Sequence, residues 1–345
     1  MKKKRLPTTS PIITTYPAET TNLTIAAQHN DFNAWVFNNN IQLMLSNDLV
    51  NAKNRFSMLE LFPFGCPLVT RTTLPEKLNC NDDIISRIEL YINNKMYVMV
   101  EVDAFYIPAS SLYSNQHGWA SILIYGYNNE TTTLYAAGFF SNSKYEFIEI
   151  PYNILCIAYS RVTTVADKKL FKSNDSICLF TLRSEFNYRF DIDCLLEAIE
   201  DYLYATAPKG YLFKACLDIR SVSEFSFGMD VYELLLLYTS RLSENANVEL
   251  DLRLFHVLYQ HKLLWIKRIQ YMNSQGYLKK ESLCKLDDMS TQMGTQSNVI
   301  RELAIKQNLV HKKEIIQSIY EDLLLLKDLD YKFHTCILDA ICPKR

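Results

Sequence analysis

The chain has 345 residues, which is more than one hydrophobic core normally serves, so we expect two globular domains. Apolar residues make up 48% of the chain and charged residues 21%, a balance that excludes a long disordered arm. The net charge of −2 provides no general attraction to phosphate or to anionic lipid. Nucleic acid and membrane surfaces are therefore not expected partners.

The N-terminus and the cysteines both favour a cytoplasmic protein. The basic residues 1–5 precede a polar, proline-containing stretch where a signal peptide would have its apolar core. The 9 cysteines are scattered without the paired spacing of a zinc or redox motif, and their odd number argues against a disulfide framework. Phosphate-binding glycine loops are absent as well. We expect no metal and no cofactor.

The first half of the sequence predicts helices followed by strands. Asn30 or Asp31 can cap a helix that runs to about Ser46. The other predicted helices of this half are 84–92, with Asp82 or Asp83 as its cap, and 152–160. Runs rich in β-branched and aromatic residues predict strands at 96–102, 120–125, 132–139, 145–150 and 177–182.

Beyond about Phe190 the apolar residues recur at helical spacing. Four segments are predicted to be helical: 192–203, 231–242, 250–272 with Gly276 as the residue after its cap, and 312–341. We therefore predict an α+β domain over residues 1–188 and an all-helical bundle over 189–345. The runs Leu234–Leu237 and Leu323–Leu326 are apolar on more than one face, which indicates burial between helices or between the subunits of a homodimer.

Several motifs of the first half occur in the order found in one known family. They are 103–108 (DAFYIP), 126–128 (GYN), 134–140 (LYAAGFF) and 149–153 (EIPYN). In this order the segment resembles the papain-like fold of the bacteriocin-processing peptidases, and more closely the family of the butirosin-biosynthesis protein H amino-terminal domain. The resemblance implies an α+β papain-like cysteine-protease fold, followed here by the helical domain.

Members of that family use a cysteine–histidine pair to take an acyl group from a carrier-protein thioester and pass it to an amine. The resemblance places the nucleophile at the helix start, where this chain has Phe32 and Asn33. It places the histidine at Ala120 and the residue that orients it at Gly138. None of these side chains can attack a carbonyl, so the resemblance implies a degenerate triad.

Two replacement sites are possible on chemical grounds. His117 lies three residues before Ala120 and could serve Cys66 in a displaced cysteine–histidine pair. Alternatively, Glu101 and Asp103 lie two residues apart on one strand and could divide an acid and a base role. The aromatic residues Trp35, Tyr106 and Trp119 are candidates for lining a cleft over the former active site.

Two hypotheses about function follow from the resemblance, both set in natural-product or antibiotic biosynthesis. The first is a non-catalytic protein that binds a carrier protein, a peptide or a partner enzyme of the pathway. The second is an enzyme with a rebuilt site, which is either an acyltransferase or amide-forming enzyme with a displaced site at Cys66 and His117, or a hydrolase that uses the carboxylates of Glu101 and Asp103. The remaining histidines of note, His256 and His261, are five residues apart on a predicted helix and point in different directions, so they are not a metal pair.

Overall fold

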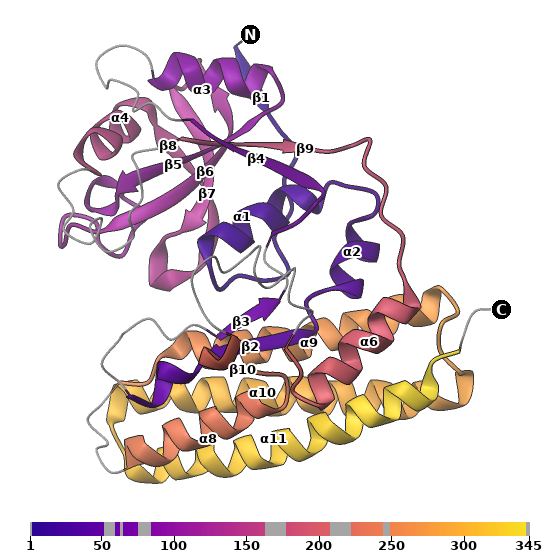
Figure 1. Ribbon diagram of the computed structural model, residues 1–345. Helices are drawn as coiled ribbons and strands as arrows, with labels where there is room; N and C mark the ends of the chain where they lie inside the picture. The colour runs from indigo at the N-terminus through magenta and orange to yellow at the C-terminus, as the bar shows by residue number, and fades with distance from the viewer. Residues whose placement is uncertain are drawn as a thin grey trace. The chain divides into compact units, whose positions relative to one another are not determined.

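The computed structural model describes residues 2–51, 59–62, 65–74, 84–162, 177–207, 222–243 and 249–342. Over these residues the chain is α+β, as the sequence predicted. It divides into two compact units, drawn together in Figure 1. The first comprises residues 1–32 and 65–187, and the second comprises residues 33–64 and 188–345.

The first unit is built on an antiparallel sheet, which has seven strands within the described residues. The strand order is β4-β9-β5-β6-β7-β8, and β1 pairs with the end of β6. The strands are β1 (Lys3–Arg5), β4 (Val69–Thr73), β5 (Tyr97–Asp103), β6 (Trp119–Asn128), β7 (Thr133–Phe139), β8 (Tyr145–Pro151) and β9 (Cys178–Leu182). Valine and isoleucine fill the middle of β5 and β6 and are fully buried, so these two strands form the centre of the core.

Three α-helices pack on this sheet in the described part of the unit. They are α1 (Pro17–Ala26), α3 (Ile84–Asn93) and α4 (Tyr152–Arg161). A single 3-10 turn, Ala104–Tyr106, follows β5, and a second one, Ser141–Ser143, joins β7 to β8. The predicted strands and the helices at 84–92 and 152–160 are confirmed, while Asp82 and Asp83 lie outside the described residues.

The second unit combines a helical bundle with a small sheet. Its described helices are α2 (Phe32–Asn38, which begins at the last residue of the first unit), α6 (Ile192–Leu203), α8 (Asp230–Ser243), α9 (Leu252–Ser274), α10 (Leu283–Val310) and α11 (Lys313–Ala340). The three longest, α9, α10 and α11, run side by side, and α8 packs along α11 (Figure 1). The small sheet has the order β10-β2-β3, with β2 (Gln42–Ser46) between β3 (Leu59–Phe62) and β10 (Phe225–Phe227). The four predicted helices of this half are confirmed, and Gly276 has the expected positive φ of 73° after α9.

The helix predicted to run to Ser46 ends instead at Asn38, and the rest of that segment is strand β2. Asn40 has a φ of 53°, in the left-handed region that asparagine tolerates better than most residues, and this ends the helix. Every residue of β2 is buried because it is the central strand. A strand buried on both faces has a continuous apolar sequence, which periodicity alone cannot distinguish from a buried helix.

Residues 33–64 were assigned to the first domain from sequence, but their contacts place them in the second unit. Arg268 of α9 explains part of this placement. Its fully buried guanidinium donates to the backbone carbonyls of Phe37 and Asn39 at 2.7 Å each, and to that of Asn40 at 3.3 Å. Burial lowers the pKa of Arg268 to about 9. Arg268 thus holds the link between α2 and β2 against the helices. Because the second unit also contains the small sheet, it is not all helical.

Candidate functional site

The structure does not bring Cys66 and His117 together. Arg71 of β4 and Tyr97 of β5 align with the same residue of β9, so β4 and β5 run parallel to one another. Cys66 lies five residues before Arg71, whereas Asp103, which holds His117, lies six residues after Tyr97. At about 3.3 Å per residue, the stretch from Tyr97 to Asp103 alone spans roughly 20 Å. The thiol and the imidazole therefore lie at opposite ends of the sheet.

The chemistry of Cys66 is also unsuited to nucleophilic attack. The side chain is buried in the turn before β4, where its backbone carbonyl accepts a hydrogen bond from Val69 N at 3.1 Å. Burial raises the pKa of the Cys66 thiol to about 12, and a hydrogen bond with the backbone of Leu68 opposes this only in part. The thiolate is the reactive form of cysteine. Cys66 is therefore a small buried side chain that stays protonated near neutral pH.

His117 instead forms a tight pair with Asp103 at the end of β5. Its Nδ1 lies 2.6 Å from Oδ2 of Asp103. Asp103 is fully buried, and its other oxygen, Oδ1, accepts the backbone N–H groups of Phe105 at 3.1 Å and Gly118 at 3.2 Å. Both carboxylate oxygens are thus engaged. Asp103 is thus placed to orient the imidazole.

The ring of His117 is held by aromatic contacts as well as by its hydrogen bond with Asp103. It stacks on Phe105, with ring centroids 4.2 Å apart and planes inclined by 19°, and Tyr106 lies 6.0 Å away. The His117 side chain is 53% exposed even though its carboxylate partner is at 0%. An imidazole held at Nδ1 by a buried carboxylate and exposed on the other side is the arrangement that orients a catalytic or ligand-binding histidine. Sequence reasoning named both residues but did not pair them.

Glu101 lies on the same surface of β5 as Asp103 and pairs across to Ser121. One of its carboxylate oxygens, Oε2, is buried without a hydrogen-bond partner among the described residues. Trp119 pairs directly with Asp103. The end of β5 and the start of β6 thus carry a carboxylate, an oriented imidazole and aromatic side chains within a few residues. Of the three aromatic cleft candidates, this region contains Tyr106 and Trp119.

Trp35, the third cleft candidate, belongs to the second unit, where it is buried in α2. The positions that the resemblance gave to the nucleophile, Phe32 and Asn33, stand at the start of the same helix. The division between the units falls between these two residues. The helix of the first unit that contacts β4 and β7 is α1 rather than α2.

The two other degenerate positions, Ala120 and Gly138, share one surface of the sheet. Ile124 of β6 pairs with Ala136 of β7, and residues directly opposite one another point to the same side. Because side chains alternate along a strand, Ala120 and Gly138 lie on the side of Ile124 and Ala136. The two positions are therefore neighbours in space, as the resemblance expects of a histidine and its orienting residue.

The helix α1 covers the opposite surface. Tyr145 of β8 pairs with Phe139, the residue after Gly138, and so lies on the other side of the sheet. The hydroxyl of Thr24 in α1 donates to the hydroxyl of Tyr145 at 3.1 Å. Ala120 and Gly138 therefore face away from α1.

A second polar cluster fills the core of the helical unit. Asp330 lies in the buried stripe of α11, and its Oδ2 accepts from Lys262 Nζ at 2.6 Å, Tyr202 OH at 2.6 Å and Tyr232 OH at 2.9 Å. All four side chains are fully buried. Burial alone would raise the pKa of Asp330, but the positive charge of Lys262 holds it well below its usual range. The same burial lowers the pKa of Lys262.

Two histidines complete this cluster. His261 Nδ1 lies 2.9 Å from Lys262 Nζ, and its Nε2 lies 2.8 Å from the backbone oxygen of Ile41. Burial lowers the pKa of His261 well below its ordinary value, so the ring is neutral. His334 Nδ1 lies 2.9 Å from the carbonyl of Asp330. Since every member is shielded from solvent, the cluster joins α6, α8, α9 and α11 rather than presenting a surface to a ligand.

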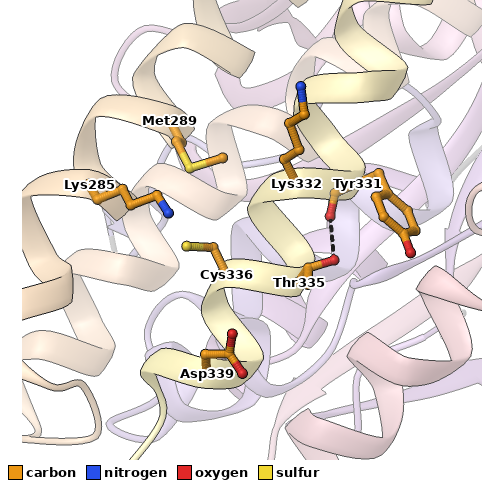
Figure 2. A pocket seen from close by; sticks show the side chains of 7 residues that line it. All are labelled: Lys285, Met289, Tyr331, Lys332, Thr335, Cys336 and Asp339. Atoms are coloured by element: carbon orange, nitrogen blue, oxygen red, sulfur yellow. Dashed lines mark hydrogen bonds between the residues drawn. The ribbon is translucent and has the colours of Figure 1, made fainter.

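A surface groove of about 350 Å³ runs between α10 and α11. Lys285 and Met289 line it from α10, and Tyr331, Lys332, Thr335, Cys336 and Asp339 line it from α11. Figure 2 shows the side chains of Lys285 and Cys336 extending into the groove from its two sides.

Neither protein-family models nor curated proteins match this sequence. In the described ranges, no group of three or more His, Cys, Asp or Glu side chains is arranged to hold a metal ion. No helix in the part of the chain that the structure describes is long and apolar enough to cross a membrane. The site is therefore interpreted from its own geometry.

Proposed function

We propose that this protein is a papain-like relative that has lost its cysteine nucleophile and binds its ligand without forming a covalent intermediate. The observation that carries the proposal is the separation of Cys66 from His117 by the whole length of β5. A cysteine-dependent transferase needs the thiol and the base within hydrogen-bonding distance. The displaced cysteine–histidine site considered from sequence lacks this contact.

The chemistry that remains at the end of β5 is suited to recognition. The imidazole of His117 is oriented by Asp103 and can exchange a hydrogen bond with an amide, a hydroxyl or a carbonyl through Nε2. Phe105 and Tyr106 add aromatic surface next to it. In natural-product assembly in the cytoplasm, which the resemblance implies, we propose that the ligand is the acyl or peptidyl group of a carrier protein, or a peptide segment of a partner enzyme.

Titration calorimetry with a synthetic acyl-pantetheine thioester tests this proposal. We expect saturable binding that His117→Ala weakens by about tenfold, the effect of losing one hydrogen bond and a stacked ring. His311→Asn is the matched control, because His311 is an exposed histidine of the other unit with a φ of 51° that asparagine also accepts. Equal affinities for the wild type and His117→Ala would exclude the end of β5 as the binding site.

The His117–Asp103 pair also favours a second candidate function, that of a transferase that acts by direct attack. His117 would remove a proton from the amine of an acceptor as that amine attacks the thioester carbonyl, and would then return a proton to the leaving thiolate. This route needs a base and its orienting carboxylate but no cysteine. Amide formation from the thioester and an added amine, abolished by His117→Ala and unchanged in Cys66→Ala, would establish this function in place of simple binding.

A further inference from the structure

The leucine run of α11 places two of its side chains in the core and two on the surface. In α11, Leu323 and Leu326 are buried, whereas Leu324 is 44% and Leu325 is 63% exposed. A well-packed helix of a bundle has no structural need for two adjacent exposed leucines. Exposed apolar side chains that lie together indicate a contact surface rather than an ordinary solvated face.

The exposed leucines lie on the same face of α11 as the groove. Leu324 and Thr335 are eleven residues apart, as are Leu325 and Cys336. Eleven residues make about three turns, so each pair points in nearly the same direction, roughly 16 Å apart along the helix. One face of α11 therefore carries two protruding leucines at one end and a groove at the other.

Opposite charges lie on this face beside the leucines, and one of them, Lys332, lines the groove. Asp328 and Lys332 are both exposed and form an ion pair with 2.5 Å between Lys332 Nζ and Asp328 Oδ2. They lie one turn apart, on either side of residue 330. The side chain of Asp330 points into the core, so the direction opposite to it is the centre of the exposed face.

We propose that this face of α11 binds the same face of a second copy of the chain, with the two helices antiparallel and a two-fold axis at residue 330. In that arrangement each edge of the face meets the same edge of the second copy, so Leu324 meets Thr335 of the second copy and Leu325 meets its Cys336. The leucines of each copy enter the groove of the other, beside Met289. Asp328 of each copy meets Lys332 of the other.

A second copy fits this face because both its shape and its charge are self-complementary. The leucines and the groove lie at equal distances on the two sides of residue 330, and so do the acid and the base. A two-fold axis at that point superimposes each feature on its complement, which is the property of an isologous interface. An acidic or a basic partner would instead meet one charge of its own sign. The inference does not depend on the ligand proposed for the first unit.

Sedimentation equilibrium of the full chain tests the proposal. We expect a dimer whose dissociation constant rises by about tenfold or more in Leu325→Glu, because the variant places a charge in the groove of the second copy. Leu309→Glu is the matched control, since Leu309 is a 75% exposed leucine at the far end of α10. We expect this control to leave the dimer unchanged. Circular dichroism checks that each variant is folded.

Charge exchange tests the register. Asp328→Lys places two lysines opposite one another at each end of the contact, and Lys332→Asp places two acids there, so each should weaken the dimer. The double variant, with both substitutions, restores the opposite charges and should recover the wild-type dissociation constant to within about threefold. A monomeric wild type at 100 μM or so, a dimer unaffected by Leu325→Glu, or a double variant no better than the single ones would each overturn the proposal.

Discussion

Among the residues that the structure describes, each unit contains a fully buried aspartate with a basic partner, and the two partners differ in whether they reach solvent. Asp103 holds His117, whose side chain is half exposed. Asp330 holds Lys262, which is completely buried together with its tyrosine neighbours. A carboxylate whose partner reaches solvent can orient a functional group, whereas one whose partner is enclosed can only hold helices together. The comparison separates a candidate site from a structural one without reference to any relative.

The largest effect expected from this difference is on folding. Asp330→Ala should lower the free energy of unfolding by about 3 to 5 kcal/mol, because it leaves the ammonium of Lys262 buried and unpaired. Urea denaturation followed by circular dichroism measures the loss. Glu302→Ala, which removes an exposed carboxylate of α10, is the control and should change stability by no more than about 0.5 kcal/mol. Similar losses of stability in both variants would show that the Asp330 cluster does not hold α6, α8, α9 and α11 together.

Replacing both Lys262 and Asp330 tests whether the buried charges themselves stabilise the helical unit. The double variant Lys262→Met with Asp330→Leu removes both buried charges at once. We expect it to recover at least about half of the stability lost in Asp330→Ala, because an apolar pair of similar size avoids the cost of burying charge. A double variant less stable than Asp330→Ala would mean that the tyrosines and histidines around the pair depend on its charges.

Acid should destabilise the helical unit through His261. Its pKa in the folded chain is well below the ordinary value of 6.5, so it is neutral when folded and becomes protonated on unfolding. The unfolded chain then binds more protons, and stability is full above pH 6.5 and falls as the pH drops below that value. The free energy of unfolding should therefore fall steadily as the pH is lowered below 6.5.

Denaturation of the wild type and His261→Gln above and below pH 6.5 isolates this contribution from those of the facing groups Lys262, Asp330, Arg268 and His334. Glutamine retains a donor for the carbonyl of Ile41 but does not titrate. We expect a smaller pH dependence in the variant. Parallel pH dependences in the two proteins would contradict a neutral buried His261.

In the first unit, replacing Asp103 should lower the stability more than replacing His117. Asp103→Ala leaves the backbone N–H groups of Phe105 and Gly118 without their acceptor and should cost about 1 to 2 kcal/mol of stability. His117→Ala removes a half-exposed ring and should cost less than about 1 kcal/mol, although it should weaken ligand binding. Thermal unfolding of both variants checks the ranking. A greater loss for His117→Ala would mean that the imidazole is a packing residue.

The smallest effect is expected at Cys66. Its pKa of about 12 predicts almost no thiolate near neutral pH, and its burial restricts access. Iodoacetamide labelling of the native protein, read by peptide mass spectrometry, should modify the exposed Cys284 well before Cys66. Rapid labelling of Cys66 in the folded chain would contradict the environment described for it.

The regular elements of the sheet were predictable because each predicted strand is rich in β-branched and aromatic residues and is bounded by a turn. The strand β2 was not, because all of its side chains are buried and its run of apolar residues follows a helix directly. The one signal against a continuous helix was the triplet of asparagines at 38–40, the last of which has a positive φ. Three residues of that type in succession disfavour a helix interior.

The helix α10 escaped prediction for a different reason. Its buried positions recur with the spacing of a heptad, but several of them are polar or small: Leu286, Ser290, Met293, Ser297, Ile300, Ala304 and Gln307. Serine and glycine allow a close approach of α9, since a Cβ added to Gly294 would lie 3.0 Å from Ile266. A helix that buries small polar side chains gives a weak apolar period, so its sequence resembles a surface segment.

The members of the candidate site were named from sequence, but their pairing was not. Asp103 and His117 are fourteen residues apart, and the loop that returns His117 to the strand end contains 3-10 and turn structure with no apolar pattern. From sequence, the partner considered for His117 was therefore Cys66, in a displaced cysteine–histidine pair. The hydrogen bond to Asp103 depends on tertiary structure that no local spacing records.

The central claim is that this chain forms no covalent acyl intermediate, since its buried thiol and its oriented imidazole lie at opposite ends of one sheet. Intact-mass spectrometry of the protein after incubation with an acyl-pantetheine thioester tests it most directly. The account predicts an unchanged mass at all times of incubation. A mass increase equal to the acyl group, present in the wild type and absent in Cys66→Ala, would contradict it.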